Sequence, residues 1–117
     1  MVKRSSWVPQ RGDLVWISLN PQAGHEQAGH RPMLVMSPKA YNGTVGLMLA
    51  CPVTRQAKGY PFEVALPEGS PVQGVILSDH VRSLDWKVRK AEFICAMPEE
   101  TVSETGEKLG TLLPTAR

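Results

Sequence analysis

The sequence has no long hydrophobic run. Among its 117 residues, no apolar segment approaches the roughly 20 residues that a helix needs to cross a bilayer. The N-terminal MVKRSSWVPQRGD contains basic residues with no hydrophobic stretch behind them, so we expect no signal peptide. We therefore expect a cytoplasmic protein with no membrane partner.

Cysteine is scarce, and the motifs of several enzyme classes are missing. Cys51 and Cys95 both lie in apolar stretches, LMLACPV and FICAM, so we expect small buried side chains rather than a disulfide. The three histidines and two cysteines show no C-x-x-C or H-x-x-x-H spacing, which disfavours a zinc site. No Walker loop, GxSxG elbow or dinucleotide fingerprint occurs. We expect no metal and no cofactor.

The net charge is small and unevenly distributed. Residues 1–97 hold 11 Lys and Arg against 7 Asp and Glu, a balance of +4, whereas residues 98–117 hold 2 against 4. A mildly basic body followed by an acidic segment is compatible with a nucleic-acid partner without requiring one.

What is present indicates one mostly β domain spanning residues 1–117. Ten glycines and ten prolines separate short apolar runs, a pattern typical of short strands joined by turns. The patterns predict strands at 14–19, 33–37, 46–53, 62–66, 75–77 and 91–97. The strand at 75–77 could run on past Asp79 to Val81, and residues 38–43 form a break between strands that could hold one helical turn.

The C-terminal segment changes to a helical period. Val102, Leu109, Leu112 and Leu113 can share one face of a helix over residues 98–113, with proline and acidic residues at its start. The fold class we expect is therefore mostly β with a C-terminal helix: a small barrel or curled sheet at about residues 9–97, closed by that helix.

The loop at residues 20–31 is the first candidate site. Its residue types suit RNA cleavage without a metal, in which Glu26 accepts a proton, Arg31 holds the phosphate and His30 donates a proton. Glu26 and Arg31 could equally form a surface ion pair worth less than about 1 kcal/mol. The residue types alone favour the ion pair.

Two further segments carry polar groups. The segment at 54–61, TRQAKGYP, combines cations with an aromatic ring, which can hold phosphates and stack an unpaired base, or can form an ordinary solvated hairpin loop. In the segment at 78–83, Asp79 could orient a ligand, cap a turn or pair with Arg82. Asp79 and His80 are not expected to pair, because neighbouring side chains on a strand point to opposite faces.

Three segments, taken in order, carry a family resemblance. They are PQRGDLVWISLNPQAGHEQAGHRPMLVMSPKAYN, CPVTRQAKGYPFEV and GVILSDHVRSLDW, and they cover most of residues 9–90. Together they closely resemble the MazF/PemK-type toxin endoribonucleases, or mRNA interferases, of type II toxin–antitoxin modules. The C-terminal helix pattern is compatible, although its residues diverge.

The resemblance implies a fold, an activity and partners. The fold would be a small SH3-like β-barrel with a C-terminal helix, working as a homodimer. The activity would be sequence-selective, metal-independent and ribosome-independent cleavage of single-stranded RNA, usually mRNA, leaving 2′,3′-cyclic phosphate and 5′-hydroxyl ends. A cognate antitoxin with an extended acidic tail would block the site.

The resemblance also implies roles for particular residues. Arg31 would stabilise the phosphorane, Glu26 would act as base or orient the 2′-hydroxyl, and Thr54 would bond the phosphate. The proton donor stays open between Arg31 and His30. The PemK branch uses an aspartate that corresponds to Asp79 and an arginine two residues earlier, where this chain has a leucine. The expected substrate-binding residues are Gln56, Lys58, Tyr60, Asp79, Arg55 and His25.

Two other functions remain open on the residues. One is a protein-targeting toxin on the same fold, similar to gyrase poisons, and the other is a non-catalytic SH3-like module that binds RNA or protein. Neither would need an acid–base loop, so cleavage of RNA distinguishes them from the nuclease.

Overall fold

The computed structural model describes residues 7–19 and 29–114. In these residues the elements follow the order β1 (Asp13–Ser18), β2 (His30–Val35), α1 (Lys39–Val45), β3 (Leu47–Thr54), β4 (Glu63–Ala65), β5 (Val75–Leu77), β6 (Arg82–Asp85), β7 (Glu92–Ala96) and α2 (Glu99–Gly110).

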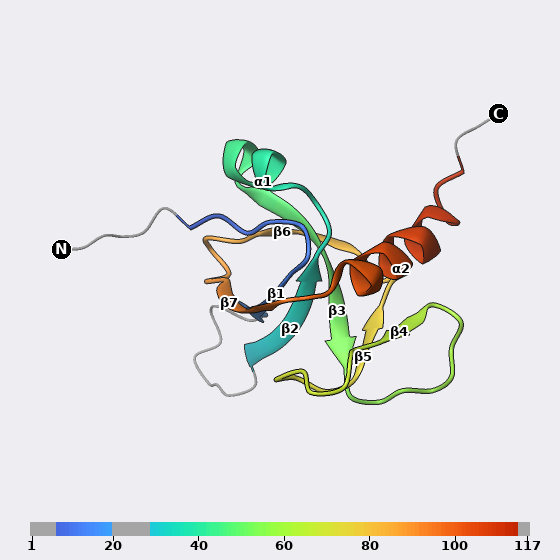
Figure 1. The fold of residues 1–117 in the computed structure, drawn as a ribbon. Coiled ribbons are helices and arrows are strands. Elements are labelled where there is room, and N and C mark those ends of the chain that lie inside the picture. The colour runs from blue at the N-terminus through green and yellow to red at the C-terminus, as the bar shows by residue number, and fades with distance from the viewer. Residues whose placement is uncertain (1–6, 20–28, 115–117) are drawn as a thin grey trace.

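The described strands form one antiparallel sheet with the C-terminal helix packed on it (Figure 1). The order along the sheet is β4-β5-β3-β2-β1-β7, and β6 also pairs with β3. The expected class, mostly β with a C-terminal helix, is confirmed. Over the described residues the sheet curls without closing, with β4 and β7 at its ends, so "barrel" describes it only loosely.

Two apolar clusters lie on opposite faces of the sheet. Neighbours in sequence, such as Leu14 and Val15, belong to different clusters, as the alternation of side chains along a strand requires. The cluster beneath α2 contains Leu14, Leu34, Cys51, Val53, Val64, Ile76, Met97 and Val102. The cluster on the other face contains Val15, Ile17, Met33, Val35, Met48, Ala50, Leu84 and Trp86.

β3 is the central strand, and it changes partner along one edge. The first half of this edge pairs with β6 and the second half with β5. Because the Leu49 carbonyl accepts from Met36 N–H at 2.8 Å, odd-numbered residues of β3 direct their backbone groups toward β2. The backbone nitrogen of Pro52, which carries no hydrogen, therefore faces the opposite edge of β3, between the ladders with β6 and β5. No ladder hydrogen bond is lost at this position. The turn at 78–81 passes this position.

A buried asparagine fixes α1 and the segment before β1. The Nδ2 of Asn42 donates to the Pro9 and Ser37 carbonyls at 2.8 and 3.1 Å, and its Oδ1 accepts from the Ser37 hydroxyl at 2.6 Å. The indole N–H of Trp86 donates to the Asn42 carbonyl at 3.0 Å. Every polar atom of this buried amide is thus bonded to a neighbouring segment.

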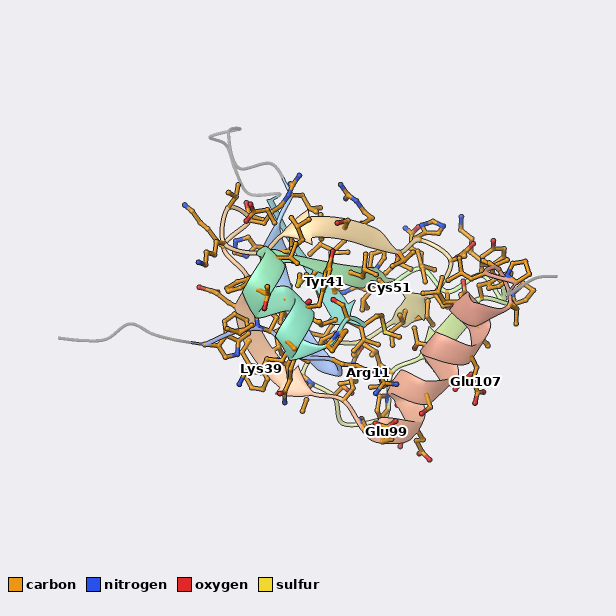
Figure 2. The ribbon with its side chains drawn as sticks, turned by 90° about the horizontal axis from the view of Figure 1, so that it is seen from above. Arg11, Lys39, Tyr41, Cys51, Glu99 and Glu107 are labelled. Carbon is orange, nitrogen blue, oxygen red and sulfur yellow. The ribbon has the colours of Figure 1, made fainter. Side chains whose placement is uncertain are left out.

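α2 is anchored chiefly through its first two turns. Thr101, Val102 and Thr105 are buried, and Figure 2 shows Arg11 beside Glu99, with a guanidinium–carboxylate distance of 3.5 Å. The expected helical face was wrong at its end, because Leu112 and Leu113 follow the helix and are 47% and 63% exposed. No helix among the described residues is long and apolar enough to span a membrane.

Two strand predictions need correction. β2 begins at His30 rather than Met33, because β1 pairs with its polar residues as far as Ser18. The strand expected to run on to Val81 ends at Leu77, and a separate strand, β6, follows the turn. Three of the four β6 residues are exposed, so that strand carries almost no hydrophobic signal.

Candidate nucleic-acid site

An open pocket of about 390 Å³ lies where β3 ends. The lining residues that the structure describes are Thr54, Gln56, Lys58, Tyr60, Glu63, Leu77 and His80. The ladder pairs Thr54 with Val75 and Glu63 with Leu77, so the strand residues of the lining project from one face of the sheet. The pocket thus adjoins the face that carries the cluster around Met48.

Thr54 is fixed by its own turn and by a close backbone approach. Its Oγ1 accepts from the Gln56 N–H at 3.2 Å, which leaves the hydroxyl proton available to a ligand. Gly74 passes so near that a Cβ there would overlap the Thr54 carbonyl oxygen. A side chain at position 74 would therefore displace Thr54.

Arg31 projects from β2 on the pocket's face of the sheet. β2 and β3 pair Met33 with Pro52. Arg31 lies two residues before Met33 on β2 and opposite Ile17 of β1, so it projects from the same face as Met33 and Ile17. The described lining of the pocket does not include Arg31, so it stands beside the pocket rather than within it.

His30 points to the other face of β2, because it adjoins Arg31 on the strand. Its ring centroid lies 6.1 Å from that of Trp16, and the residue is exposed. The strand thus separates His30 from Arg31, which the sequence had placed together in one loop.

A carboxylate holds the backbone of the loop between β3 and β4. Glu63 accepts from the Lys58 and Gly59 N–H groups at 2.9 and 3.1 Å. The side chains of Gln56 and Lys58 line the pocket, and Arg55 is exposed on the same loop. Glu63 was not predicted as a site residue, although a carboxylate just after a Lys-Gly turn is a signal for such bonds.

Asp79 joins this loop to the turn after β5. Its Oδ2 accepts from the Tyr60 hydroxyl at 2.6 Å, and its side chain is 15% exposed. The bond to Asp79, followed by desolvation, raises the pKa of Tyr60 above its ordinary value. Both residues were expected to bind substrate. In the structure Tyr60 lines the pocket, whereas Asp79 faces inward behind it.

His80 lies on the pocket and contacts Asp79, contrary to expectation. The two residues lie in a turn, where strand alternation does not apply, and His80 Nε2 is 3.8 Å from Asp79 Oδ1. The His80 N–H donates to the Leu77 carbonyl at 3.1 Å, which sets the turn. The sequence prediction failed because it extended β5 through these positions.

The cysteines are free, as expected. Cys51 is buried, and desolvation with the nearby Asp79 charge raises the pKa of its thiol to about 12. Cys95 is half-buried, and burial raises its pKa as well. Two other predicted site residues, Glu26 and His25, lie outside the described residues.

Fold and pocket define a small antiparallel β-protein with an open pocket that presents a lysine, a carboxylate, a hydroxyl and a histidine. Residues 10–113 match the model of the family described as PemK-like, MazF-like toxin of type II toxin–antitoxin system. The chain belongs to this family.

Similar proteins are curated endoribonucleases. The chain is 51% identical to the endoribonuclease toxin MazF of Escherichia coli K12 over 87 residues, 74% of this chain and 78% of that protein. It is 36% identical to the Escherichia coli endoribonuclease PemK over 117 residues, 97% of this chain and 87% of that protein. These relatives support endoribonuclease activity for this chain.

Solved structures agree with the fold. A crystal structure of MazF from Deinococcus radiodurans matches with a TM-score of 0.83 and 58% identity, covering 92% of this chain and 98% of that one. A MazE–MazF crystal structure from the same organism matches with a TM-score of 0.85 and 50% identity, covering 95% and 100%.

Proposed function

We propose that this toxin cleaves single-stranded RNA, chiefly mRNA, by attack of the 2′-hydroxyl on the neighbouring phosphate. Cleavage is sequence-selective, needs neither a metal nor the ribosome, and leaves 2′,3′-cyclic phosphate and 5′-hydroxyl ends. The loss of mRNA inhibits translation and growth. The observation that carries the proposal is the pocket at the end of β3, with Thr54 in its wall and Arg31 on the same face of the neighbouring strand β2.

The reaction needs a cation, a hydrogen-bond donor and a base. The Arg31 guanidinium stabilises the charge that develops on the phosphorane, because its fork of donors matches phosphate oxygens. Thr54 donates its free hydroxyl proton to the phosphate. Glu26 takes the proton of the 2′-hydroxyl or orients that group.

The loop after β3 holds the flanking nucleotides. Lys58 attracts a backbone phosphate, Gln56 bonds a base or sugar, and the Tyr60 ring offers a stacking surface. Arg55, Asp79 and His25 complete the proposed substrate-binding set. Because Asp79 accepts the hydrogen bond of the Tyr60 hydroxyl, it acts on the substrate by positioning the Tyr60 ring.

The test is cleavage of a long single-stranded RNA by the purified chain in excess EDTA, with the new ends mapped. We expect 2′,3′-cyclic phosphate ends, and a loss of about 10²–10³-fold in rate for Arg31→Ala. Arg11→Ala is the matched control, because Arg11 lies by the start of α2, and it should cut at the original rate.

The other outcomes discriminate between functions. Intact RNA together with inhibition of DNA gyrase would indicate a protein-targeting toxin. RNA binding without cleavage would indicate a binding module. Cleavage that stops on removal of divalent ions would contradict the metal-independent reaction.

Two partners belong to the same proposal. The chain forms a homodimer, and an antitoxin covers the RNA site with an extended acidic segment. Support comes from the MazE–MazF complex among the similar structures and from Lys58 in the pocket, which would attract an acidic segment.

A further inference from the structure

His80 is the histidine of the described pocket lining. It lies in the turn at 78–81, opposite no strand partner, and its side chain is 55% exposed. A ligand in the pocket can therefore reach the imidazole, whereas His30 lies on the other face of its strand.

Asp79 has an unused carboxylate oxygen that faces this ring. Its Oδ1 is buried and has no hydrogen-bond partner among the described residues, while Oδ2 is occupied by Tyr60. A buried acceptor without a donor is costly, and His80 Nε2, at 3.8 Å, is positioned to supply one after a small rotation. With Nε2 directed at Asp79, the other ring nitrogen is left for the pocket.

The other groups of the pocket are poorly suited to donate a proton near neutral pH. The Tyr60 hydroxyl is committed to Asp79, which raises its pKa, and the Glu63 carboxylate already accepts two backbone N–H groups. Guanidinium and ammonium groups hold their protons too strongly, whereas imidazole as a residue type exchanges a proton in this range.

We propose that His80 is the general acid of RNA cleavage, the group that protonates the departing 5′-oxygen. This inference rests on the proposed nuclease function. The 2′-oxygen forms its bond to phosphorus as its proton passes to the base of that reaction. The bond from phosphorus to O5′ breaks as imidazolium gives its proton to O5′, and the neutral ring then regains a proton from solvent.

The experiment compares two substrates of the same sequence with the full chain and with His80→Gln. One substrate has the natural linkage at the cleaved position, and the other has sulfur in place of the bridging 5′-oxygen. A thiolate leaves without protonation, so it needs no acid. We expect His80→Gln to cut the natural linkage about 10²–10⁴-fold more slowly and the sulfur linkage at nearly the original rate.

Each of the other outcomes would contradict either the role of His80 or the proposed function. Equal losses on both linkages would assign His80 a binding or structural role, and no loss on either would remove it from the reaction. A leaving-group-dependent loss in His30→Gln instead would make that residue the acid. An original chain that cuts neither substrate would contradict the proposed function itself. Thermal unfolding of each variant checks that the fold is retained.

Discussion

At the scale of single residues, Gly74 determines where Thr54 lies. Its φ is +132°, and an added Cβ would meet the Thr54 carbonyl oxygen and the Arg55 Cα. Neither neighbour is the end of a flexible side chain, so the backbone itself would have to shift.

We predict that Gly74→Ala lowers the free energy of unfolding by about 1–3 kcal/mol and also reduces RNA cleavage. Gly69→Ala is the control, because Gly69 has a φ of +85° but nothing within 4 Å of its added Cβ. It should cost stability while leaving cleavage intact. Denaturant unfolding and cleavage rates measure the two effects, and equal cleavage by both variants would contradict the role of Gly74 at the site.

Tyr60 gives a spectroscopic measure of its bond to Asp79. Because that bond raises its pKa, Tyr60 in the folded chain should ionise above 10.0, its ordinary value. The associated stability is present below pH 10.0 and is lost as the pH rises through the raised pKa.

Phenolate absorbance in a Tyr41→Phe background measures this titration, since the chain has two tyrosines. We expect a midpoint above 10.0 that falls toward 10.0 in Asp79→Asn. Circular dichroism at the same pH values checks that the chain is folded. An unchanged midpoint in Asp79→Asn would argue against the bond.

At the scale of elements, α1 depends on one amide. We predict that Asn42→Ala lowers the free energy of unfolding by about 2–4 kcal/mol, because it leaves the Ser37 hydroxyl proton without an acceptor and the buried Pro9 carbonyl without a donor. Thr44→Ala, on the exposed part of the same helix, should change stability by less than about 0.5 kcal/mol. Urea unfolding measures the free energy of unfolding of both variants. Similar losses would contradict a special contribution of the Asn42 amide to stability.

The elements differ in how far the sequence predicts them. The cores of β1, β3 and α2 follow from hydrophobic runs and from the change of period after residue 98. β6 could not be found in this way, because its one buried residue, Leu84, leaves no alternation to recognise.

The site was predicted only in part for a related reason. Thr54, Gln56, Lys58 and Tyr60 are close in sequence, so one loop pattern suggests them together. His80 reaches the same pocket through the registers of two ladders and a turn, and no local pattern encodes that geometry.

At the scale of the whole molecule, the charge distribution predicts competition. The proposed RNA site combines Arg31 and Lys58, so an acidic peptide in extended form should bind there and inhibit cleavage. We expect inhibition that RNA relieves and that weakens as salt rises. A neutral peptide of the same length is the control. Tight binding of the acidic peptide without inhibition would contradict the shared site.

Pro52 has a consequence for how such toxins diverge. Because no ladder bond crosses from it to the neighbouring edge, the turn at 78–81 can gain or lose a residue without breaking the sheet. The same change within β3 would turn Thr54 to the opposite face. Evolution can therefore alter one wall of the pocket on a scaffold that stays constant.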